Sequence, residues 1–210
     1  MVGIVYATRR EADPFLVRIQ ADLLESRPFS LFRGRAAGIR PCIVVVSGMG
    51  KVAAAMAAMY LVLEQHVSLL ISAGLCGGLD LNHRWAAGDL LRIESAVEGD
   101  CDRLGRGETP VDCDGRWFGR LEAARLVTCD RPVFDGAWRA RLAEKGDLAD
   151  MEGAAVARAA GLYGVPCAMI KGISDAADES GRQELADNID RVSVRIADAL
   201  LRELVTDKSV

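Results

Sequence analysis

One stretch, residues 150–178, constrains the fold of this chain more than any other: DMEGAAVARAAGLYGVPCAMIKGISDAAD. Its small residues predict a helix over 153–163, a Gly-Val-Pro turn follows, and the apolar run 167–173 predicts a buried strand. Acidic residues stand at two neighbouring element ends, Glu152 before the helix and Asp175 after the strand. Because ligands of open α/β sheets bind outside the carboxyl ends of strands, we expect both carboxylates to face one pocket.

A purely structural role explains the same two carboxylates. The first turn of a helix has unpaired N–H groups and a positive dipole end, so acidic residues are favoured there as caps. The pattern of Glu152 and Asp175 therefore leaves a helix-capping role and a ligand-binding role open.

Composition sets limits on the class of protein. The 210 residues, half of them hydrophobic and 27% charged, suit one α/β domain over 1–210, without a linker or an internal repeat. The net charge of −4 gives no electrostatic case for nucleic acid. No apolar run approaches the roughly 20 residues that span a bilayer, and the first residues become charged too early for a signal peptide.

The cysteines and histidines indicate a reduced, cytoplasmic protein without a metal. No Cys-x-x-Cys pair is present, and several cysteines lie in apolar runs, where cysteine acts as a small hydrophobic residue. Two histidines make a histidine-based metal site improbable, and we expect no cofactor.

The remaining pattern alternates strands and helices. The first helix is predicted to start at Asp13 and Pro14, with an apolar face that extends to Leu23 and Leu24. Segment 98–116 has no periodicity and is predicted to be a long loop, which in compact domains is often functional. Strands are predicted at 2–6, 29–33, 42–46, 69–73, 90–97 and 126–129, and further helices at 51–66, 136–145 and 183–204.

Two glycine-rich turns follow strands. SGMGK begins at Ser47 and Gly48 and precedes a helix, whose free N–H groups could hold an oxyanion, a phosphate or a hydroxyl. A single Gly-x-Gly is a weak signal, since such glycines also simply permit a tight turn. The second turn contains Gly74, Gly77 and Gly78, which indicate either close backbone approach to a ligand or dense packing of strands.

Four pieces, in this order, resemble the purine nucleoside phosphorylase superfamily, most closely its 5′-methylthioadenosine/S-adenosylhomocysteine nucleosidase branch. They are GIVYATRRE, SGMGKVAAAM, SAGLCGGLD with the following GDL, and DMEGAAVA with IKGISDAAD. The resemblance implies a three-layer α/β fold with a central mixed, partly barrel-like sheet flanked by helices. It also implies a homo-oligomer, a dimer in the nucleosidase branch and often a hexamer among the phosphorylases.

The resemblance implies roles for the acidic residues in cleaving the N-glycosidic bond of a purine nucleoside. Asp175 matches the acid that serves protonation of purine N7, and Ser174 the residue that supports it. Glu152, with Met151 before it, matches the pair that holds the ribose hydroxyls. Glu11 matches the glutamate that orients the attacking water. Such a division resembles an inverting glycosidase, with an acid on the leaving-group side and a carboxylate for water opposite.

Further positions match parts of the substrate site. Ser47 and Gly48 correspond to the turn near the attacking water, and Gly74 to the glycine of the glycine-rich strand end. Pro132 to Phe134 corresponds to the place where the family contacts the purine, through backbone groups such as those of Val133 and an aromatic ring. Phe134 is the candidate for stacking on the base, and an ordinary core position is the alternative.

The nucleophile is either water or phosphate. The hexameric phosphorylases hold phosphate with an arginine and a serine around the strand-end glycine, where this chain has Ser72 and Leu75. The carboxylate of Glu11 would also repel phosphate, so we favour hydrolysis. Arg9 and Arg10 replace acidic residues of the nucleosidases and could bind an anion, which keeps a phosphorylase as the alternative. Aspartate at the base suits a 6-amino purine such as adenine, although aspartate also occurs in relatives of mixed specificity.

Several departures from the family concern the 5′ side of the substrate. Leu75 is bulky for a position that faces ligand, and the segment 97–126 is short and lacks the family's helix. GLCGGLD and DRPV resemble hopanoid-biosynthesis relatives that act on an adenosyl-lipid, and an open 5′ side would suit a large 5′ group. The departures also allow a catalytically silent nucleoside-binding protein, although binding alone needs no proton donor and no group that orients water.

Overall fold

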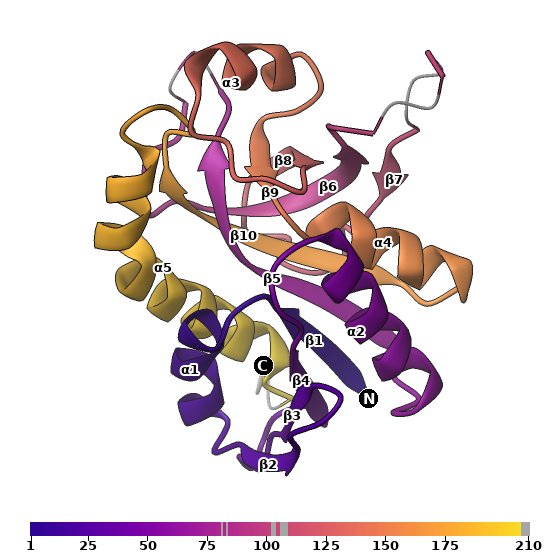
Figure 1. Ribbon diagram of the computed structural model, residues 1–210. Coiled ribbons are helices and arrows are strands. Elements are labelled where there is room, and N and C mark those ends of the chain that lie inside the picture. Colours follow the sequence, from indigo (N-terminus) through magenta and orange to yellow (C-terminus); the bar gives the residue numbers. More distant parts are fainter. Residues whose placement is uncertain (81, 83, 102–103, 106–108, 207–210) are drawn as a thin grey trace.

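The computed structural model describes residues 1–80, 82, 84–101, 104–105 and 109–206. In this part, ten strands form one mixed sheet, and five helices lie against it (Figure 1). The strands are β1 (Val2–Tyr6), β2 (Asp22–Glu25), β3 (Ser30–Arg33), β4 (Cys42–Val46), β5 (Leu69–Gly78), β6 (Leu90–Glu98), β7 (Val111–Asp112), β8 (Ala123–Thr128), β9 (Leu148–Asp150) and β10 (Cys167–Asp175). The helices are α1 (Arg9–Arg18), α2 (Lys51–Leu63), α3 (Gly136–Ala143), α4 (Gly153–Leu162) and α5 (Gly181–Leu204).

The sheet closes on itself over five strands. β10 pairs with β6, β6 with β8, β8 with β9 and β9 with β5, and the parallel pairing of β5 with β10 completes the ring. Beyond β5 the sheet continues through β1, β4, β3 and β2. The predicted fold class, an α/β protein with a central mixed, partly barrel-like sheet flanked by helices, is confirmed.

Helices cover both faces of the sheet. α1 and α5 lie on one face, α2 and α4 lie on the other, and α3 sits at one end of the barrel (Figure 1). Every residue of β10 is buried, as expected for a central strand with both faces covered. Gly172 of β10 permits α5 to approach, because a Cβ atom there would overlap the side chain of Val192.

The first helix starts earlier than predicted. α1 begins at Arg9 because Thr8 and Glu11 form a capping box, with Thr8 N 3.0 Å from Glu11 Oε2 and Glu11 N 3.3 Å from Thr8 Oγ1. The start predicted at Pro14 was wrong, since this proline lies inside the helix. Leu23 and Leu24 belong to β2 rather than to the helix face, because α1 ends at Arg18 and the chain then turns.

Besides β2, two short strands were not predicted. β7 interrupts the expected loop over 98–116 and pairs with β6. β9 has three residues, too few to produce a periodic signal, yet it closes the barrel between β8 and β5. The last residue of β9 is Asp150, which lies at the cavity described below, as does Glu152 two residues later. Among the helices that the structure describes, none has the length and apolar composition to cross a membrane.

Candidate active site

A cavity of about 230 Å³ opens where α1, β5, β9 and β10 meet. It lies at the carboxyl ends of the parallel strands β5 and β10, the end at which α/β sheets bind ligands. The carboxylates of Glu11, Glu152 and Asp175, which belong to distant parts of the sequence, all line it. Its other walls are formed by Ala7, Thr8, Met49, Leu75, Cys76, Gly77, Pro132, Val133, Phe134, Ala149, Asp150, Met151, Ser174, Leu185 and Ile189.

Glu11 is fixed by both of its carboxylate oxygens. The Thr8 hydroxyl donates a hydrogen bond of 2.6 Å to Oε2, and the backbone N–H of Leu75 donates one of 3.0 Å to Oε1. Gly74 leaves the space for this carboxylate, because a Cβ atom there would lie 3.0 Å from Oε1. Gly74 therefore makes room for the Glu11 carboxylate and does not itself line the cavity.

Glu152 precedes α4 but does not cap it. It occupies the N-cap position without a side-chain hydrogen bond to the helix, and its Oε1 instead accepts one of 2.8 Å from Gly50 N, at the start of α2. The glycine-rich turn thus binds a carboxylate of the protein. Burial raises the pKa of Glu152 to about 7, and the negative charge of Asp150 adds to this effect.

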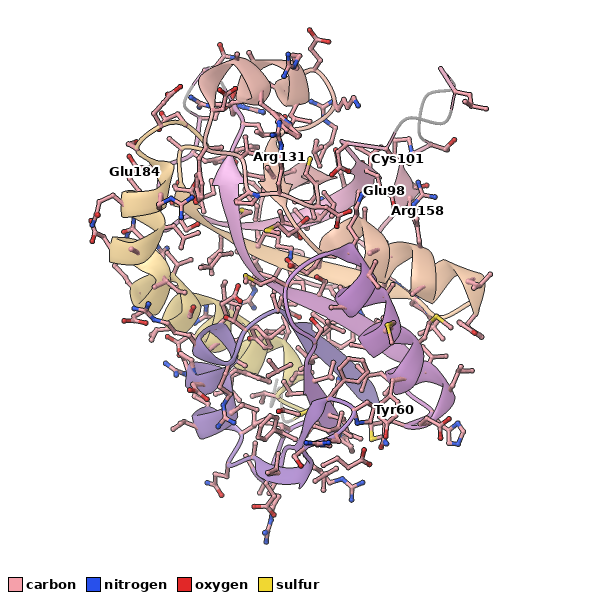
Figure 2. All side chains as sticks on the ribbon, in the orientation of Figure 1. Tyr60, Glu98, Cys101, Arg131, Arg158 and Glu184 are labelled. Carbon is pink, nitrogen blue, oxygen red and sulfur yellow. The ribbon has the colours of Figure 1, made fainter. Side chains whose placement is uncertain are left out.

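Asp175 is the last residue of β10 and is only 3% exposed. The Ser174 hydroxyl donates a hydrogen bond of 2.6 Å to its Oδ2, and Ala177 N donates one of 2.9 Å to its Oδ1. Burial nevertheless raises the pKa of Asp175 to about 6, against the effect of these two donors. Glu184, on the first turn of α5 (Figure 2), holds the following segment by accepting a hydrogen bond of 2.9 Å from Ala176 N.

An ion pair between Lys171 and Asp150 lies beneath the carboxylates, and sequence analysis missed it. Lys171 Nζ is 2.7 Å from Asp150 Oδ2, and both side chains are almost completely buried. Asp150 also accepts hydrogen bonds from Thr128 Oγ1 (2.6 Å) and Gly153 N (2.8 Å). One signal could have revealed it: a lysine inside the apolar run 167–173 must find a partner, because a buried unpaired charge is very costly.

One wall of the cavity is built by the segment after β8. Val133 is buried and Phe134 half-buried, and both line the cavity. The ring of Phe134 lies against Gly181 at the start of α5, where a Cβ atom would be 2.8 Å from its Cδ1. The Arg182 guanidinium carbon lies 5.3 Å from the ring centroid, so this ring is at the edge of the core.

Besides Gly74, four residues singled out in the sequence lie outside the cavity lining. The Ser47 hydroxyl donates to the backbone oxygen of Gly48 (2.7 Å) and is buried behind the turn, while Gly48 itself is exposed. Arg9 pairs with an aspartate one helical turn further along α1. Arg10 makes two hydrogen bonds, of 2.7 and 2.9 Å, to Asp190 on α5. Both arginines are exposed and paired on the surface.

The electrostatic character of the cavity follows from its lining. Four carboxylates line it, those of Glu11, Asp150, Glu152 and Asp175, whereas none of the described lining residues is a lysine, an arginine or a histidine. Lys171 lies behind the wall and is neutralised by Asp150. The cavity thus favours a neutral ligand on which positive charge develops, and it disfavours a phosphate ion.

Comparison with known proteins identifies the class to which this fold and this cavity belong. The model of the phosphorylase superfamily matches residues 2–206, so the chain is a member of that superfamily. A 5′-methylthioadenosine/S-adenosylhomocysteine nucleosidase of Treponema pallidum (strain Nichols) is 27% identical over 208 residues, covering 76% of this chain and 75% of the relative.

Solved structures agree on the fold. The 5′-methylthioadenosine/S-adenosylhomocysteine nucleosidase of Helicobacter pylori, in complex with a small molecule, superposes with a TM-score of 0.87 at 22% identity, and the match covers 95% of each chain. The futalosine hydrolase of Helicobacter pylori strain 26695 has a TM-score of 0.86 at 22% identity, covering 95% of this chain and 94% of that one.

Proposed function

We propose that this protein is an N-glycosidase that hydrolyses a purine nucleoside, in particular a 5′-substituted adenosine, and releases the free base. One observation carries the proposal: the cavity combines four carboxylates, two with raised pKa values, and no cation among its described lining residues. Breaking an N-glycosidic bond needs a proton on the departing base and negative groups near an oxocarbenium-like sugar. The relatives named nucleosidases and hydrolases support the same reaction class.

Asp175 is proposed to protonate the base. A carboxyl group with a pKa of about 6 carries a proton in an appreciable fraction of molecules near neutral pH, and exclusion of water by a bound purine would raise that fraction. Ser174 and Ala177 hold the carboxyl group at the cavity wall. Phe134 and the backbone at Val133 are proposed to bind the purine from the other side.

Glu152 is proposed to bind the ribose hydroxyls, with Met151 packed against the sugar. Its carboxylate is held by Gly50 N through one oxygen, which leaves the other for a ligand hydroxyl. Binding a hydroxyl donor would favour the ionised form, and this negative charge stabilises the positive charge that develops at C1′.

Glu11 is proposed to orient the attacking water. Each of its oxygens already accepts from the protein, so the carboxylate cannot rotate, and its remaining lone pairs point at fixed directions. Fixed orientation is what a water-positioning group needs, because misplacement of the nucleophile weakens catalysis steeply. Leu75, whose side chain lines the cavity, then lies beside this water.

The placement of Arg9 and Arg10 bears on the phosphorylase alternative. Both guanidinium groups are engaged by aspartates on the surface and neither lines the cavity. A phosphate site there would need both ion pairs to break and Glu11 to lose its charge. Hydrolysis is therefore the better supported reaction.

Homo-oligomerisation, with a dimer as the first expectation, is also part of the proposal. The side of α2 that carries larger apolar residues faces outward, since the alanines on the other side pack against the sheet. Val52 is 72% and Met56 58% exposed, and Met49, which lines the cavity, is 69% exposed. Tyr60 lies near the far end of the same helix (Figure 2). A charged Met56→Glu variant should elute later in size-exclusion chromatography if this face is the interface, and an unchanged elution volume would contradict the assignment.

The decisive experiment measures base release with and without phosphate. The substrates are adenosine, inosine, 5′-methylthioadenosine, S-adenosylhomocysteine and a 5′-alkyl adenosine with a long chain. We expect release of adenine that does not depend on phosphate, and a loss of at least about 100-fold in Glu11→Gln. Strict phosphate dependence would identify a phosphorylase. Tight binding without turnover of any substrate would identify a nucleoside-binding protein, and preference for the long-chain substrate would support the adenosyl-lipid alternative.

A further inference from the structure

A second cavity lies apart from the carboxylate cavity. Its volume is about 600 Å³, and none of its lining residues belongs to the carboxylate cavity. The walls come from the segment that leads into β6, the segment before β8 and the C-terminal half of α5. This volume lies within the range of roughly 300–1,000 Å³ that is typical of small-molecule sites. The lining residues with charged or aromatic side chains are Arg84, Trp85, Asp89, Arg120, Glu122, Arg195, Asp198 and Arg202.

Four arginines from three parts of the chain line this arginine cavity. Arg195 and Arg202 are seven residues apart on α5, hence on the same side of the helix and roughly 10 Å apart along its axis. Within the part of the chain that the structure describes, no ion pair engages Arg120, Arg195 or Arg202. Gly88, at φ +105°, leaves room for the guanidinium group of Arg195, since a Cβ atom there would lie 3.0 Å from Nη1.

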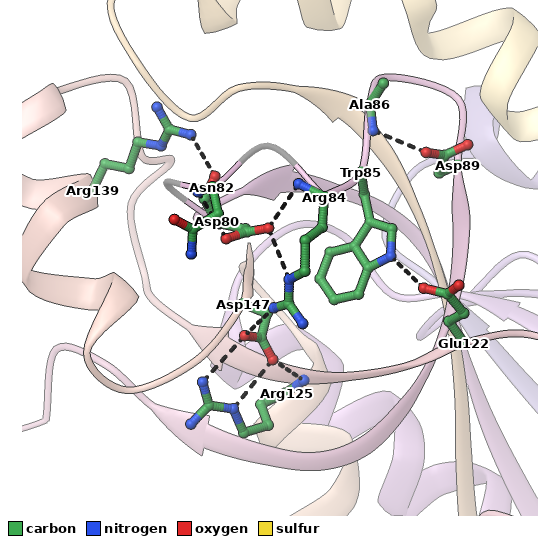
Figure 3. A network of polar contacts seen from close by, with 10 residues as sticks. All are labelled: Asp80, Asn82, Arg84, Trp85, Ala86, Asp89, Glu122, Arg125, Arg139 and Asp147. Atoms are coloured by element: carbon green, nitrogen blue, oxygen red, sulfur yellow. Dashed lines mark hydrogen bonds and ion pairs between the residues drawn. The ribbon is translucent and has the colours of Figure 1, made fainter.

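Each carboxylate in the lining has at least one partner within the protein. Asp198 pairs with Arg18 of α1 at 2.7 Å, outside the cavity lining. Glu122 accepts a hydrogen bond of 2.7 Å from Trp85 Nε1, and Asp89 accepts one of 2.9 Å from Ala86 N (Figure 3). Asp89 and Glu122 each keep a negative charge and a second oxygen that takes no part in these bonds. Within the described residues, the guanidinium groups of Arg120, Arg195 and Arg202 have no ion pair, and these three cations outnumber the two unpaired carboxylates.

One wall is held rigidly by further ion pairs. Arg84 Nε lies 3.0 Å from Asp80 Oδ2, and Arg84 Nη2 lies 3.1 Å from Asp147 Oδ1, which Arg125 also contacts (Figure 3). The guanidinium carbon of Arg84 lies 4.3 Å from the ring centroid of Trp85, within cation–π range. The indole is thereby fixed between Arg84 and Glu122, so this side of the cavity needs little ordering when a ligand binds.

We propose that the arginine cavity binds a small molecule that carries two or more phosphate groups. Guanidinium groups match phosphate oxygens in paired hydrogen bonds, and their charge is permanent. Two arginines two helical turns apart suit anionic groups that are separated along one ligand better than a single phosphate. The chain as a whole has a net charge of −4, so a wall with four arginines does not reflect a generally basic composition. This proposal is independent of the reaction at the carboxylate cavity.

Calorimetric titration with tripolyphosphate, at an ionic strength held constant with sodium chloride, tests the site. We expect saturable binding of one tripolyphosphate per chain and an affinity reduced at least about tenfold in the double variant Arg195→Gln/Arg202→Gln. Arg141→Gln is the matched control, because Arg141 is also exposed and lies in the last turn of a helix. It should bind like the wild type. Orthophosphate is expected to bind more weakly than tripolyphosphate.

The same titration on Glu152→Gln separates the two cavities. Binding should be unchanged in this variant if the anion occupies the arginine cavity. Three results would each overturn the proposal: no saturable binding to the wild type, equal affinity of the double variant and the wild type, or equal weakening by Arg141→Gln. Retained melting temperatures of all variants without ligand would show that a loss of binding is not a loss of folding.

Discussion

Replacing Asp175 by asparagine tests the proposed acid most directly, because asparagine has the same size but no transferable proton. Asp175 is 3% exposed, and burial raises its pKa to about 6. At pH 7 a group with that pKa is protonated in about one molecule in ten, against about one in 1,600 at the ordinary value of 3.8. General acid catalysis contributes about 10²–10⁴-fold, so the variant should lose that much in kcat/KM.

The same substitution should stabilise the protein at high pH. A raised carboxyl pKa means that the folded state disfavours ionisation of Asp175. The contribution of this group to the free energy of unfolding is therefore fully present below the unfolded-state pKa of about 4, and it is lost as the pH rises to about 6 and above. The shift from 3.8 to about 6 corresponds to at most about 3 kcal/mol. Asp175→Asn avoids this loss, so we expect its melting temperature to exceed that of the wild type by roughly 5 °C at pH 8 and to match it at pH 4.

The assay compares two substrates that differ in their leaving group. 5′-Methylthioadenosine needs a proton on its departing base, whereas the 4-nitrophenolate group of a 4-nitrophenyl riboside departs without one. Asp175→Asn should therefore lose far more activity on the first substrate than on the second. Asp187→Asn, at an exposed position of α5 outside the cavity lining, serves as the control and should retain activity on both. Equal loss on both substrates would refute the proton-donor role.

Two other substitutions test how the site is held. Lys171→Met leaves the buried carboxylate of Asp150 without its cation. It should lower the free energy of unfolding, measured by urea denaturation, by about 3–5 kcal/mol. The control Lys145→Met, at an exposed position, should change this free energy by less than about 0.5 kcal/mol. Lys51 Nζ lies 2.7 Å from Asp100 Oδ1 and 3.3 Å from Asp130 Oδ2, and so holds the start of the segment that is proposed to bind the base. Lys51→Met should raise KM several-fold with little change in kcat, Lys51→Arg should restore it, and a fall in kcat alone would contradict this positioning role.

Local pattern alone predicted most of the secondary structure. The strand at 2–6 agrees with the observed bounds, and the last helix, predicted over 183–204, is observed over Gly181–Leu204 with Val192, Ile196 and Leu200 buried. Such elements are determined by residues that are close in sequence, through apolar spacing and turn residues. The capping box of Thr8 and Glu11 is a local signal of the same kind, and it starts α1 at Arg9, four residues before the predicted Asp13. β9 was not predictable, because only its partners β5 and β8 make it a strand.

Residue types alone fix which carboxylates are available, whereas the partners and the burial of each carboxylate depend on the tertiary structure. Glu152 could have capped α4, but the proximity of α2 gives its carboxylate Gly50 N as a partner. The pairing of β5 with β10 and the position of α1 bring Glu11 and Asp175 to one cavity. Burial there raises the pKa of Asp175, since desolvation depends on all the atoms around a charge and not on its neighbours in the chain.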